Sequence, residues 1–302
     1  MTPWTPTLQT LFERSIAAAR AAGACIMSYY GKELEVLSKG LDSHTGDAVT
    51  LADKEAEGII YQALFPGGDS DPARREVAVL AEEMPDYSVS LRFQRRHTFL
   101  IDPLDGTRGF IDCNNSFGVS IGLIEKDGSP VFGVVLLPAL GKLYEGVAGS
   151  HARENGKPLS PPPLDGELVL WVSEAEIFPA GKNRIWHHIG AAIQSEFPAV
   201  RKVRPACLAS PVHKGCHIAS ATGPALYLGL PRAQKGVSLW DMAATAAIVS
   251  GAGGWVSDIE GAPLELNRAE STFVHHRGFV YCTHEAIARA AMRAYAEAAA
   301  SL

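Results

Sequence analysis

HTFLIDPLDGTRGF, residues 97–110, is the stretch around which the rest of the chain is organised. Its first part is apolar or β-branched, which predicts a buried strand that Pro103 would end. Asp102 and Asp105 lie three residues apart on the turn that follows, so both carboxylates and the backbone carbonyl of Leu104 can point to one place. Oxygen ligands of this kind suit Mg²⁺.

Gly106 and Thr107 come directly after this acidic turn. If Thr107 begins a helix, the backbone amides of both residues lie at the positive end of the helix dipole, where they can bind a phosphate oxygen. Asp, Pro and Gly also occur together in ordinary turns, and the pattern taken alone favours such a turn over a metal site. The remaining sequence decides between the two interpretations.

The composition is that of a folded protein with a large core. The chain has 302 residues, of which 47% are hydrophobic and 20% are charged, enough for one large or two moderate globular domains. A net charge of -6 provides no broad basic surface and so disfavours a nucleic-acid polymer as partner. The N-terminus MTPWTPTLQT lacks a basic region followed by an apolar one, and no apolar run approaches the ~18 residues that span a bilayer. We therefore expect no membrane contact and a location in the cytoplasm.

The cysteines and histidines favour neither disulfides nor a zinc site. The five cysteines are odd in number and form no CxxC pair, so we expect free thiols. His213, Cys216 and His217 have a helical spacing that would allow zinc binding, but no fourth ligand is suggested. His275 and His276 are interpreted as part of a surface loop.

The N-terminal part of the chain predicts two helices. Residues 8–30 carry apolar residues at helical spacing and predict a packing helix that ends at Gly31, followed by a polar loop over residues 32–49. A second helix would begin after Thr50, with Asp53 three residues further on. Because Thr50 and Asp53 resemble a capping box, position alone favours a structural role for Asp53.

A second acidic strand end lies upstream of Asp102. Residues 77–80 predict a short strand, and Ala81, Glu82 and Glu83 follow it directly. A glutamate pair at a strand end is usually solvated, but this pair repeats the arrangement seen at Asp102.

Beyond Phe110 the pattern changes to strands. The predicted strands are 119–124, 131–137, 143–147 and a short piece near Ala152, which together indicate an antiparallel meander. The proline-rich stretch KPLSPPPLDGE, residues 157–167, is interpreted as a boundary. We therefore divide the chain into an N-terminal α+β half, residues 1–158, and a C-terminal α/β half, residues 159–302.

The second half alternates strands and helices, which is a layered α/β pattern. The predicted strands are 168–172, 202–204, 225–228 and 278–283, and the predicted helices are 184–196, 213–220, 242–250 and 285–302. Trp240 and Asp241 precede the third of these helices, which is built from small residues. By its position, Asp241 would be the N-cap of that helix.

Each acidic residue is ambiguous by itself, but four motifs occur together. They are DAVTLAD (47–53), VLAEE (79–83), DPLDGT (102–107) and WDMAA (240–244), the last followed by IVSGAGGWVSD. In order and spacing they resemble the motifs of the inositol monophosphatase superfamily, over residues 8–285. The resemblance implies a layered αβαβα sandwich of the inositol monophosphatase and fructose-1,6-bisphosphatase type.

The resemblance also implies an activity and its metal ligands. The protein would be a Mg²⁺-dependent phosphomonoesterase in which water attacks phosphorus directly. Glu82, Asp102 and the Leu104 carbonyl would hold the first Mg²⁺. Asp102, Asp105 and Asp241 would hold the second, and a third, weaker ion would lie near Glu82.

Catalytic and phosphate-binding roles follow from the same resemblance. Asp53 would pair with Thr107 to orient and deprotonate the attacking water, a role that competes with helix capping, and Glu82 would belong to the same catalytic group. The backbone amides of Gly106 and Thr107 would bind the remaining phosphate oxygens.

Local details resemble the CysQ-type 3′(2′),5′-bisphosphate nucleotidases within the superfamily. VLAEE is similar to their VLSEE, Arg108 is the basic residue that often follows the DPLDGT motif, and Lys214 resembles a lysine near their nucleotide site. The residues that depart from their pattern are Ala81, Gly109, Ala225 and extra residues in the 66–78 loop. These departures leave the substrate open.

Three interpretations of function therefore remain. The first is a bisphosphate nucleotidase acting on 3′-phosphoadenosine 5′-phosphate, and the second is an inositol or other sugar monophosphatase. The third is a non-catalytic binding protein on the same fold, which would lack at least one metal ligand, and none is missing here. The expected partner is a small phosphorylated metabolite, and the sequence leaves a monomer and a homodimer equally open.

Overall fold

The computed structural model describes residues 4–32, 37–38, 48–49, 51–84, 89–172, 183–232 and 236–300. Most of the predicted 32–49 loop and Thr50, the predicted N-cap of the second helix, lie outside these residues. Among the described helices, none is both long and apolar enough to cross a bilayer.

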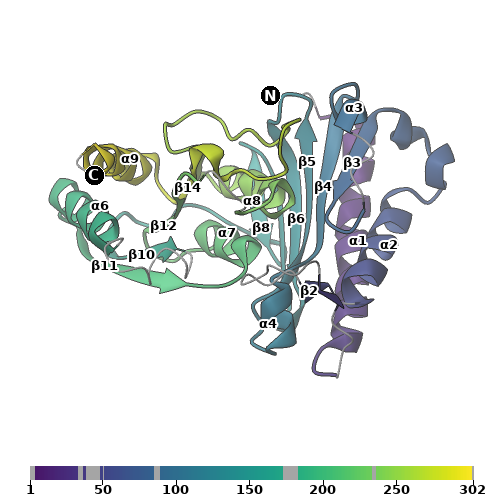
Figure 1. Ribbon diagram of the computed structural model, residues 1–302, viewed down its shortest axis with the longest axis horizontal. Coiled ribbons are helices and arrows are strands. Elements are labelled where there is room, and N and C mark those ends of the chain that lie inside the picture. The colour runs from purple at the N-terminus through teal and green to yellow at the C-terminus, as the bar shows by residue number, and fades with distance from the viewer. Residues whose placement is uncertain are drawn as a thin grey trace.

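Helices and sheets alternate in five layers, shown side by side in Figure 1. One outer layer consists of α1 (Pro6–Tyr29) and α2 (Leu51–Leu64), the middle layer of α7 (Pro211–Ala219) and α8 (Leu239–Gly251), and the other outer layer of α6 (Asn183–Glu196) and α9 (Glu285–Ala299). A seven-stranded sheet separates the first two helical layers, and a five-stranded sheet separates the last two. The predicted αβαβα sandwich is confirmed.

The seven-stranded sheet contains the predicted meander. Its strands, in spatial order, are β3 (Val77–Ala81), β4 (His97–Asp105), β5 (Gly118–Glu125), β6 (Pro130–Leu137), β7 (Lys142–Val147), β8 (His151–Glu154) and β9 (Lys157–Pro158). β3 and β4 are parallel, and every later neighbour is antiparallel. Because β3 and β4 run side by side in the same direction, Glu82, which follows β3, lies at the same end of the sheet as Asp102 and Asp105, the last acidic residues of β4.

The five-stranded sheet is built from the second half of the chain. Its spatial order is β11 (Val200–Cys207), β10 (Gly166–Val172), β12 (Ala225–Gly229), β14 (Phe279–Cys282) and β13 (Trp255–Ser257). α7 and α8 contact both sheets, so the two halves share their middle layer. The division of the chain at residue 158 stays a prediction.

Several short elements complete the described chain. They are β1 (Leu37–Ser38) paired with β2 (Ala48–Val49), the helices α3 (Val89–Arg92) and α4 (Thr107–Ile111), and the 3₁₀ turns Gly68–Ser70, Pro72–Arg75, Pro138–Leu140 and His275–Arg277. α4 begins at Thr107, which is the helix start on which the expected phosphate binding by Gly106 and Thr107 depends.

A row of glycines lets α8 lie unusually close to the seven-stranded sheet. Gly122, Gly133 and Gly146 lie directly opposite one another on β5, β6 and β7. A Cβ atom at Gly122 would lie 2.6 Å from the backbone nitrogen of Ala244, and one at Gly146 would lie 2.8 Å from the Cα of Ile248. Side chains on this glycine row would therefore displace α8, the helix that carries Asp241.

Two predicted boundaries near the acidic residues are wrong. Pro103 does not end its strand, because β4 continues to Asp105. Asp102 is paired with Ser120 and Asp105 with Gly118, so β4 holds one more residue than β5 between these pairs. Pro103 lies in this bulge, where the sheet does not need its missing N–H.

The other wrong boundary is the start of the helix at Asp241. α8 begins at Leu239 with Ser238 as its N-cap, so Asp241 is the third helical residue rather than the cap. The Asp241 carboxylate accepts a hydrogen bond from the Ser238 backbone N–H (2.8 Å). Asp241 still stabilises the helix start, but from inside the first turn.

Candidate metal and phosphate site

Three carboxylates from two elements meet at the edge of the seven-stranded sheet. Asp102 and Asp105 come from the bulged end of β4, and Asp241 comes from the first turn of α8. Each offers a carboxylate oxygen within 4.8 Å of the others, and within the part of the chain that the structure describes they are the one such group of possible metal ligands. Their exposed fractions are 2%, 5% and 8%, respectively. Buried acids at this separation need either protons or a cation.

The pKa values of these acids reflect that need. Burial, followed by the charges of Glu82 and Asp105, raises the pKa of Asp102 well above its ordinary value. Burial and the same neighbouring charges also raise the pKa of Asp241, and its side chain is hydrogen-bonded to that of Asp102. Burial raises the pKa of Asp105 to about 6, although hydrogen bonds from Ser210 and Val212 oppose the shift. Protons therefore compete with a cation for this site.

Backbone and hydroxyl donors fix the direction of the carboxylates. The Leu104 N–H donates to Asp102 Oδ1 (2.9 Å), which closes the bulge on itself. Asp105 Oδ2 accepts from the Ser210 hydroxyl and from the Val212 N–H (3.1 Å). The start of α7 thus holds one of the acids.

A pocket of about 210 Å³ opens in front of the three acids. Its lining consists of Glu82, Asp102, Leu104, Asp105, Gly106, Thr107, Arg108, Ala209, Ser238, Trp240 and Asp241. The structure therefore brings together all predicted metal ligands, since Glu82 and Leu104 line the same pocket. It also places the predicted phosphate-binding residues Gly106 and Thr107 there.

Gly106 and Thr107 make contacts within the site. Gly106 has a φ of 80°, and a Cβ there would overlap the carbonyl oxygen of Ser116, so only glycine fits. Its backbone also hydrogen-bonds the Asp105 carboxylate. The Thr107 hydroxyl donates to the carbonyl oxygen of Leu104 (3.1 Å). Both residues thus connect the metal-ligand turn to the start of α4.

Asp53 lies in the first turn of α2 and is 2% exposed. α2 packs directly on β4, the strand that ends in the acidic bulge. The predicted capping partner Thr50 is outside the described residues, so the capping role and the catalytic role of Asp53 both stay predictions.

Arg108 and Lys214, the two basic residues predicted to bind the substrate, lie in different surroundings. Arg108 is exposed at the pocket, and its Nε atom pairs with Asp112 Oδ2 (2.8 Å). Lys214 is 2% exposed, its Nζ atom lies 4.7 Å from the centre of the Tyr227 ring, and it does not line the pocket. The positive charge of Lys214 lowers the pKa of Asp105. Lys214 therefore acts on the site from inside the protein.

Ser210 is a site residue that the sequence did not predict. It is fully buried and caps α7 by accepting from the His213 N–H (2.9 Å), while its hydroxyl donates to Asp105. A serine directly before Pro211 is a typical helix start, so the cap was detectable. The contact with Asp105 was not, because it joins residues from opposite halves of the chain.

The two groups of histidines lie in different surroundings. His213, His217 and Trp171 form a stack of rings with centroids 4.7 Å apart, and no metal group in the described chain includes these residues. His275 is not in a surface loop: it is buried, and its Nδ1 atom accepts from the Val237 N–H (2.7 Å). All five cysteines are free, as predicted.

Residues 118–122, GVSIG, match the pentapeptide that surrounds a nucleophilic serine in some hydrolases. Ser120, however, is fully buried within β5, and its hydroxyl donates to the carbonyl oxygen of Trp240 (3.0 Å). A nucleophile of that class needs an exposed position on a sharp strand-to-helix turn. Ser120 therefore joins β5 to α8.

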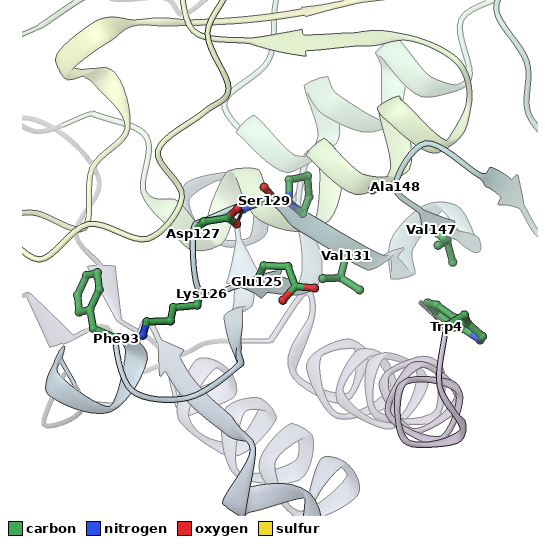
Figure 2. A pocket seen from close by; sticks show the side chains of 10 residues that line it. Trp4, Phe93, Glu125, Lys126, Asp127, Ser129, Val131, Val147 and Ala148 are labelled. Carbon is green, nitrogen blue, oxygen red and sulfur yellow. Dashed lines mark hydrogen bonds between the residues drawn. The ribbon is translucent and has the colours of Figure 1, made fainter. Parts of the chain in front are cut away.

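A larger pocket, of about 750 Å³, lies at the opposite end of β4 and β5. Figure 2 shows Phe93 and Lys126 on one side of it and Val147 and Trp4 on the other. Glu125, which also lines it, is paired with His97 at the start of β4, about 25 Å along the strand from Asp105. No group of possible metal ligands in the described chain lies there. The site chemistry is thus concentrated at the smaller, acidic pocket.

The five-layer sandwich is the fold of the inositol monophosphatases, and the buried acids lie at the end of its larger sheet. The chain belongs to the inositol monophosphatase family, whose sequence model matches residues 7–301.

Relatives of the chain include bisphosphate nucleotidases and inositol monophosphatases. The chain is 31% identical over 256 residues to 3′(2′),5′-bisphosphate nucleotidase CysQ of Escherichia coli (strain K12), covering 84% of this chain and 92% of the relative. It is 29% identical over 267 residues to human inositol monophosphatase 2, covering 87% of this chain and 84% of the relative. The crystal structure of the SuhB protein of Bartonella henselae shares the fold, with a TM-score of 0.66 at 24% identity over 94% of this chain and 97% of that one.

Proposed function

We propose that this phosphatase is a Mg²⁺-dependent 3′(2′),5′-bisphosphate nucleotidase, which converts 3′-phosphoadenosine 5′-phosphate and water into AMP and phosphate. The observation that carries the proposal is the acidic pocket. Asp102, Asp105 and Asp241 lie buried within reach of one ion, and the exposed Arg108 lines the same pocket. A cation site beside a separate basic side chain suits a substrate with two phosphate groups.

The residues present fit Mg²⁺. Asp102, Asp105 and Asp241 offer only oxygen donors, which this ion prefers, and a divalent cation would allow all three buried acids to ionise together. Glu82 and the Leu104 carbonyl, from the same pocket, would add to the ligand set. When bound, Mg²⁺ supplies positive charge that attracts a phosphate dianion and lowers the pKa of water.

The protein's own residues must orient the water and remove its proton. The reaction forms a P–O bond to water and breaks the P–O bond to the ribose 3′ oxygen, and that oxygen takes up a proton as it leaves. We assign the attacking water to Asp53 and the Thr107 hydroxyl, with Asp53 as the proton acceptor. The Thr107 hydroxyl donates to Leu104 in the structure, so pairing with Asp53 requires it to rotate.

The Thr107 backbone N–H is the proposed donor to a phosphate oxygen. Thr107 opens α4, where a backbone amide has no partner within the helix. α4 has only five residues, so the amide acts as a hydrogen-bond donor and the helix dipole adds little. The Gly106 backbone, by contrast, already contacts Asp105. Gly106 therefore serves mainly to let the chain turn.

The second candidate function is an inositol or other sugar monophosphatase. It is favoured by the similarity to human inositol monophosphatase 2, which is nearly as high as that to CysQ. A monophosphate lacks the second phosphate that Arg108 would bind. The two candidates therefore differ in what the exposed guanidinium contributes.

A phosphate-release panel with added Mg²⁺ separates the candidates. It compares 3′-phosphoadenosine 5′-phosphate, inositol 1-phosphate and AMP at equal concentrations. The nucleotidase proposal predicts the highest kcat/KM for the bisphosphate and little release from AMP. A higher kcat/KM for inositol 1-phosphate would replace it with the second candidate, and release from none of the three would contradict both.

A further inference from the structure

We propose that Glu57 is a positioning residue that holds Glu82 in place for the cation. Glu57 lies on α2, one helical turn after Asp53, and is only 5% exposed. Its Oε2 atom accepts a hydrogen bond from the backbone N–H of Glu83 (2.8 Å). Glu83 directly follows Glu82, which lines the acidic pocket. The inference rests on the proposed function, because Glu82 is a predicted Mg²⁺ ligand.

The backbone on both sides of Glu82 is fixed by hydrogen bonds. On one side, the Glu82 N–H donates to the carbonyl oxygen of Ile101 on β4 (3.1 Å). On the other side, the N–H of Glu83 belongs to the peptide plane that joins it to Glu82, and Glu57 holds this N–H. The first bond restrains φ of Glu82 and the second restrains ψ. Together they set the direction in which the Glu82 side chain leaves the backbone.

The location of Glu57 connects α2 to the metal ligands. Glu82 follows the end of β3, and α2 packs on β4, the neighbouring strand that delivers Asp102. Without the bond from Glu57, the Glu82–Glu83 peptide would lose a hydrogen bond that restrains its rotation, since the bond to Ile101 is made by the preceding Ala81–Glu82 peptide. A ligand whose backbone can rotate binds a cation less tightly, because more conformational entropy is lost on binding.

Burial of the Glu57 carboxylate needs an explanation, since glutamate is rarely buried without a partner. A hydrophobic side chain at this position on the buried face of α2 would avoid the cost of removing a carboxylate from water. The Glu57 carboxylate accepts from the backbone N–H of Glu83, which lies beyond the last residue of β3, Ala81. The geometry therefore assigns Glu57 to the turn that carries Glu82.

The first test measures Mg²⁺ binding itself. Calorimetric titration of Mg²⁺ is carried out on the wild-type protein and on three variants: Glu57→Met, Glu57→Gln and Glu57→Asp. Methionine has a similar length but no strong acceptor, and we expect it to weaken Mg²⁺ binding by roughly 10- to 100-fold, the range for removing a group that orients a metal ligand. Glutamine keeps an acceptor oxygen and should restore most of the affinity.

The aspartate variant keeps the charge but is shorter by one methylene group. Its Mg²⁺ affinity should lie between those of the glutamine and methionine variants. It also provides a measurement if the methionine variant does not fold. Equal Mg²⁺ affinity in the wild-type, aspartate and methionine proteins would overturn the positioning role.

Asp71→Leu is the matched control for a merely structural effect. Asp71 is another buried carboxylate that accepts from a backbone N–H, that of Ala73 (3.0 Å), and it pairs with Arg14 (3.1 Å). It does not line the acidic pocket. We expect this variant to melt at a lower temperature with unchanged Mg²⁺ affinity. If Glu57→Met behaves in the same way, Glu57 only stabilises the fold.

A double-mutant cycle tests whether Glu57 acts through Glu82. Glu57→Met is introduced into a Glu82→Gln background and Mg²⁺ is titrated again. If Glu57 positions Glu82, Glu57→Met should reduce the Mg²⁺ affinity of the Glu82→Gln variant only slightly. Fully additive losses would contradict the proposal. Absence of any Mg²⁺ binding by the wild-type protein would instead contradict the proposed function, so the two failures are distinguishable.

Discussion

Asp53 is the residue at which two physical roles make different predictions. It is buried in the first turn of α2, where an acid stabilises the helix start, and it is also our proposed proton acceptor. For Asp53→Asn, loss of a cap alone would lower stability by about 1 kcal/mol and leave turnover nearly intact. We expect kcat to fall by roughly 100-fold or more, the scale of general-base loss.

Steady-state kinetics and a melting curve of the same Asp53→Asn preparation check this prediction. Glu55→Gln, on the exposed side of the same helix, serves as a control for a change of charge on α2. A nearly normal kcat together with a lower melting temperature would show that Asp53 is only a capping residue.

Arg108 is the residue at which substrate choice should be visible. Its exposed guanidinium lines the acidic pocket and pairs only with Asp112 among the ion pairs of the described chain, at 2.8 Å. Loss of a charge-assisted contact to the second phosphate removes about 1.5–3 kcal/mol, or roughly 10- to 150-fold in kcat/KM. We expect Arg108→Ala to show this loss for 3′-phosphoadenosine 5′-phosphate and little loss for inositol 1-phosphate.

The comparison variant for Arg108 is Lys214→Ala. From the sequence, both side chains are predicted to bind the second phosphate, but Lys214 is buried beside Tyr227. Its charge acts on Asp105, so its removal should affect both substrates alike. If Arg108→Ala also lowers kcat/KM equally for the two substrates, Arg108 no longer supports a nucleotidase.

α8 is the element that joins the two sheets and delivers Asp241. Its close approach depends on the glycine row of Gly122, Gly133 and Gly146. A methyl group at Gly133 would overlap the Ala244 backbone, so Gly133→Ala should destabilise the fold by about 1–3 kcal/mol and weaken Mg²⁺ binding by displacing Asp241.

Denaturant unfolding and Mg²⁺ titration test this prediction. Gly58→Ala is the matched control, because Gly58 lies on the exposed side of α2 with no atom near the added methyl group. It should stabilise the protein by about 0.5–1 kcal/mol, since alanine favours helix. If Gly133→Ala is as stable as the wild type, the glycine row does not determine how closely α8 packs.

The helices and strands were predictable from the sequence where they depend on the local pattern of apolar and turn-forming residues. The strand before Asp102 and the meander beyond Phe110 follow from apolar runs and turn residues. The bulge at Pro103 was not predictable, because it depends on the pairing register with β5. The contact from Ser210 to Asp105 was missed for a related reason: it spans 105 positions and exists only once α7 packs beside the site.

The candidate ligands were predictable only as a set. Singly, Asp241 looks like a helix cap, and it does accept from the Ser238 backbone. Glu82 looks like a solvated strand end, yet it lines the acidic pocket. Local chemistry could not reveal that these residues meet, because their meeting depends on parallel β3 and β4 and on α8 crossing the sheet.

At the scale of the whole molecule, metal binding and stability should be linked through pH. Burial raises the pKa of Asp105 from 3.8 to about 6, so the contribution of this group to stability without metal is present at low pH and lost as pH rises through that interval. The pKa values of Asp102 and Asp241 are also raised, so the loss of stability without metal continues to higher pH. A bound cation favours the ionised acids and should reverse this trend.

We therefore expect the increase in melting temperature on adding Mg²⁺ to be larger at about pH 8 than at about pH 5. Comparing protein with Mg²⁺ and with chelator at the same pH cancels the titration of buried histidines away from the site, such as His275, whose pKa burial lowers to about 4. An increase that is equal at both pH values would show that protons and Mg²⁺ do not compete for these acids.

All of these predictions depend on one proposal, that the buried acids around Asp102 hydrolyse a phosphomonoester. Phosphate release from 3′-phosphoadenosine 5′-phosphate, measured for the wild-type protein and for Asp102→Asn with Mg²⁺ or with chelator, tests it most directly. Asparagine has nearly the same shape, so the variant should fold, as circular dichroism would verify. We expect release only by the wild-type protein with Mg²⁺. Undiminished release by folded Asp102→Asn, or by the wild-type protein in chelator, would contradict it.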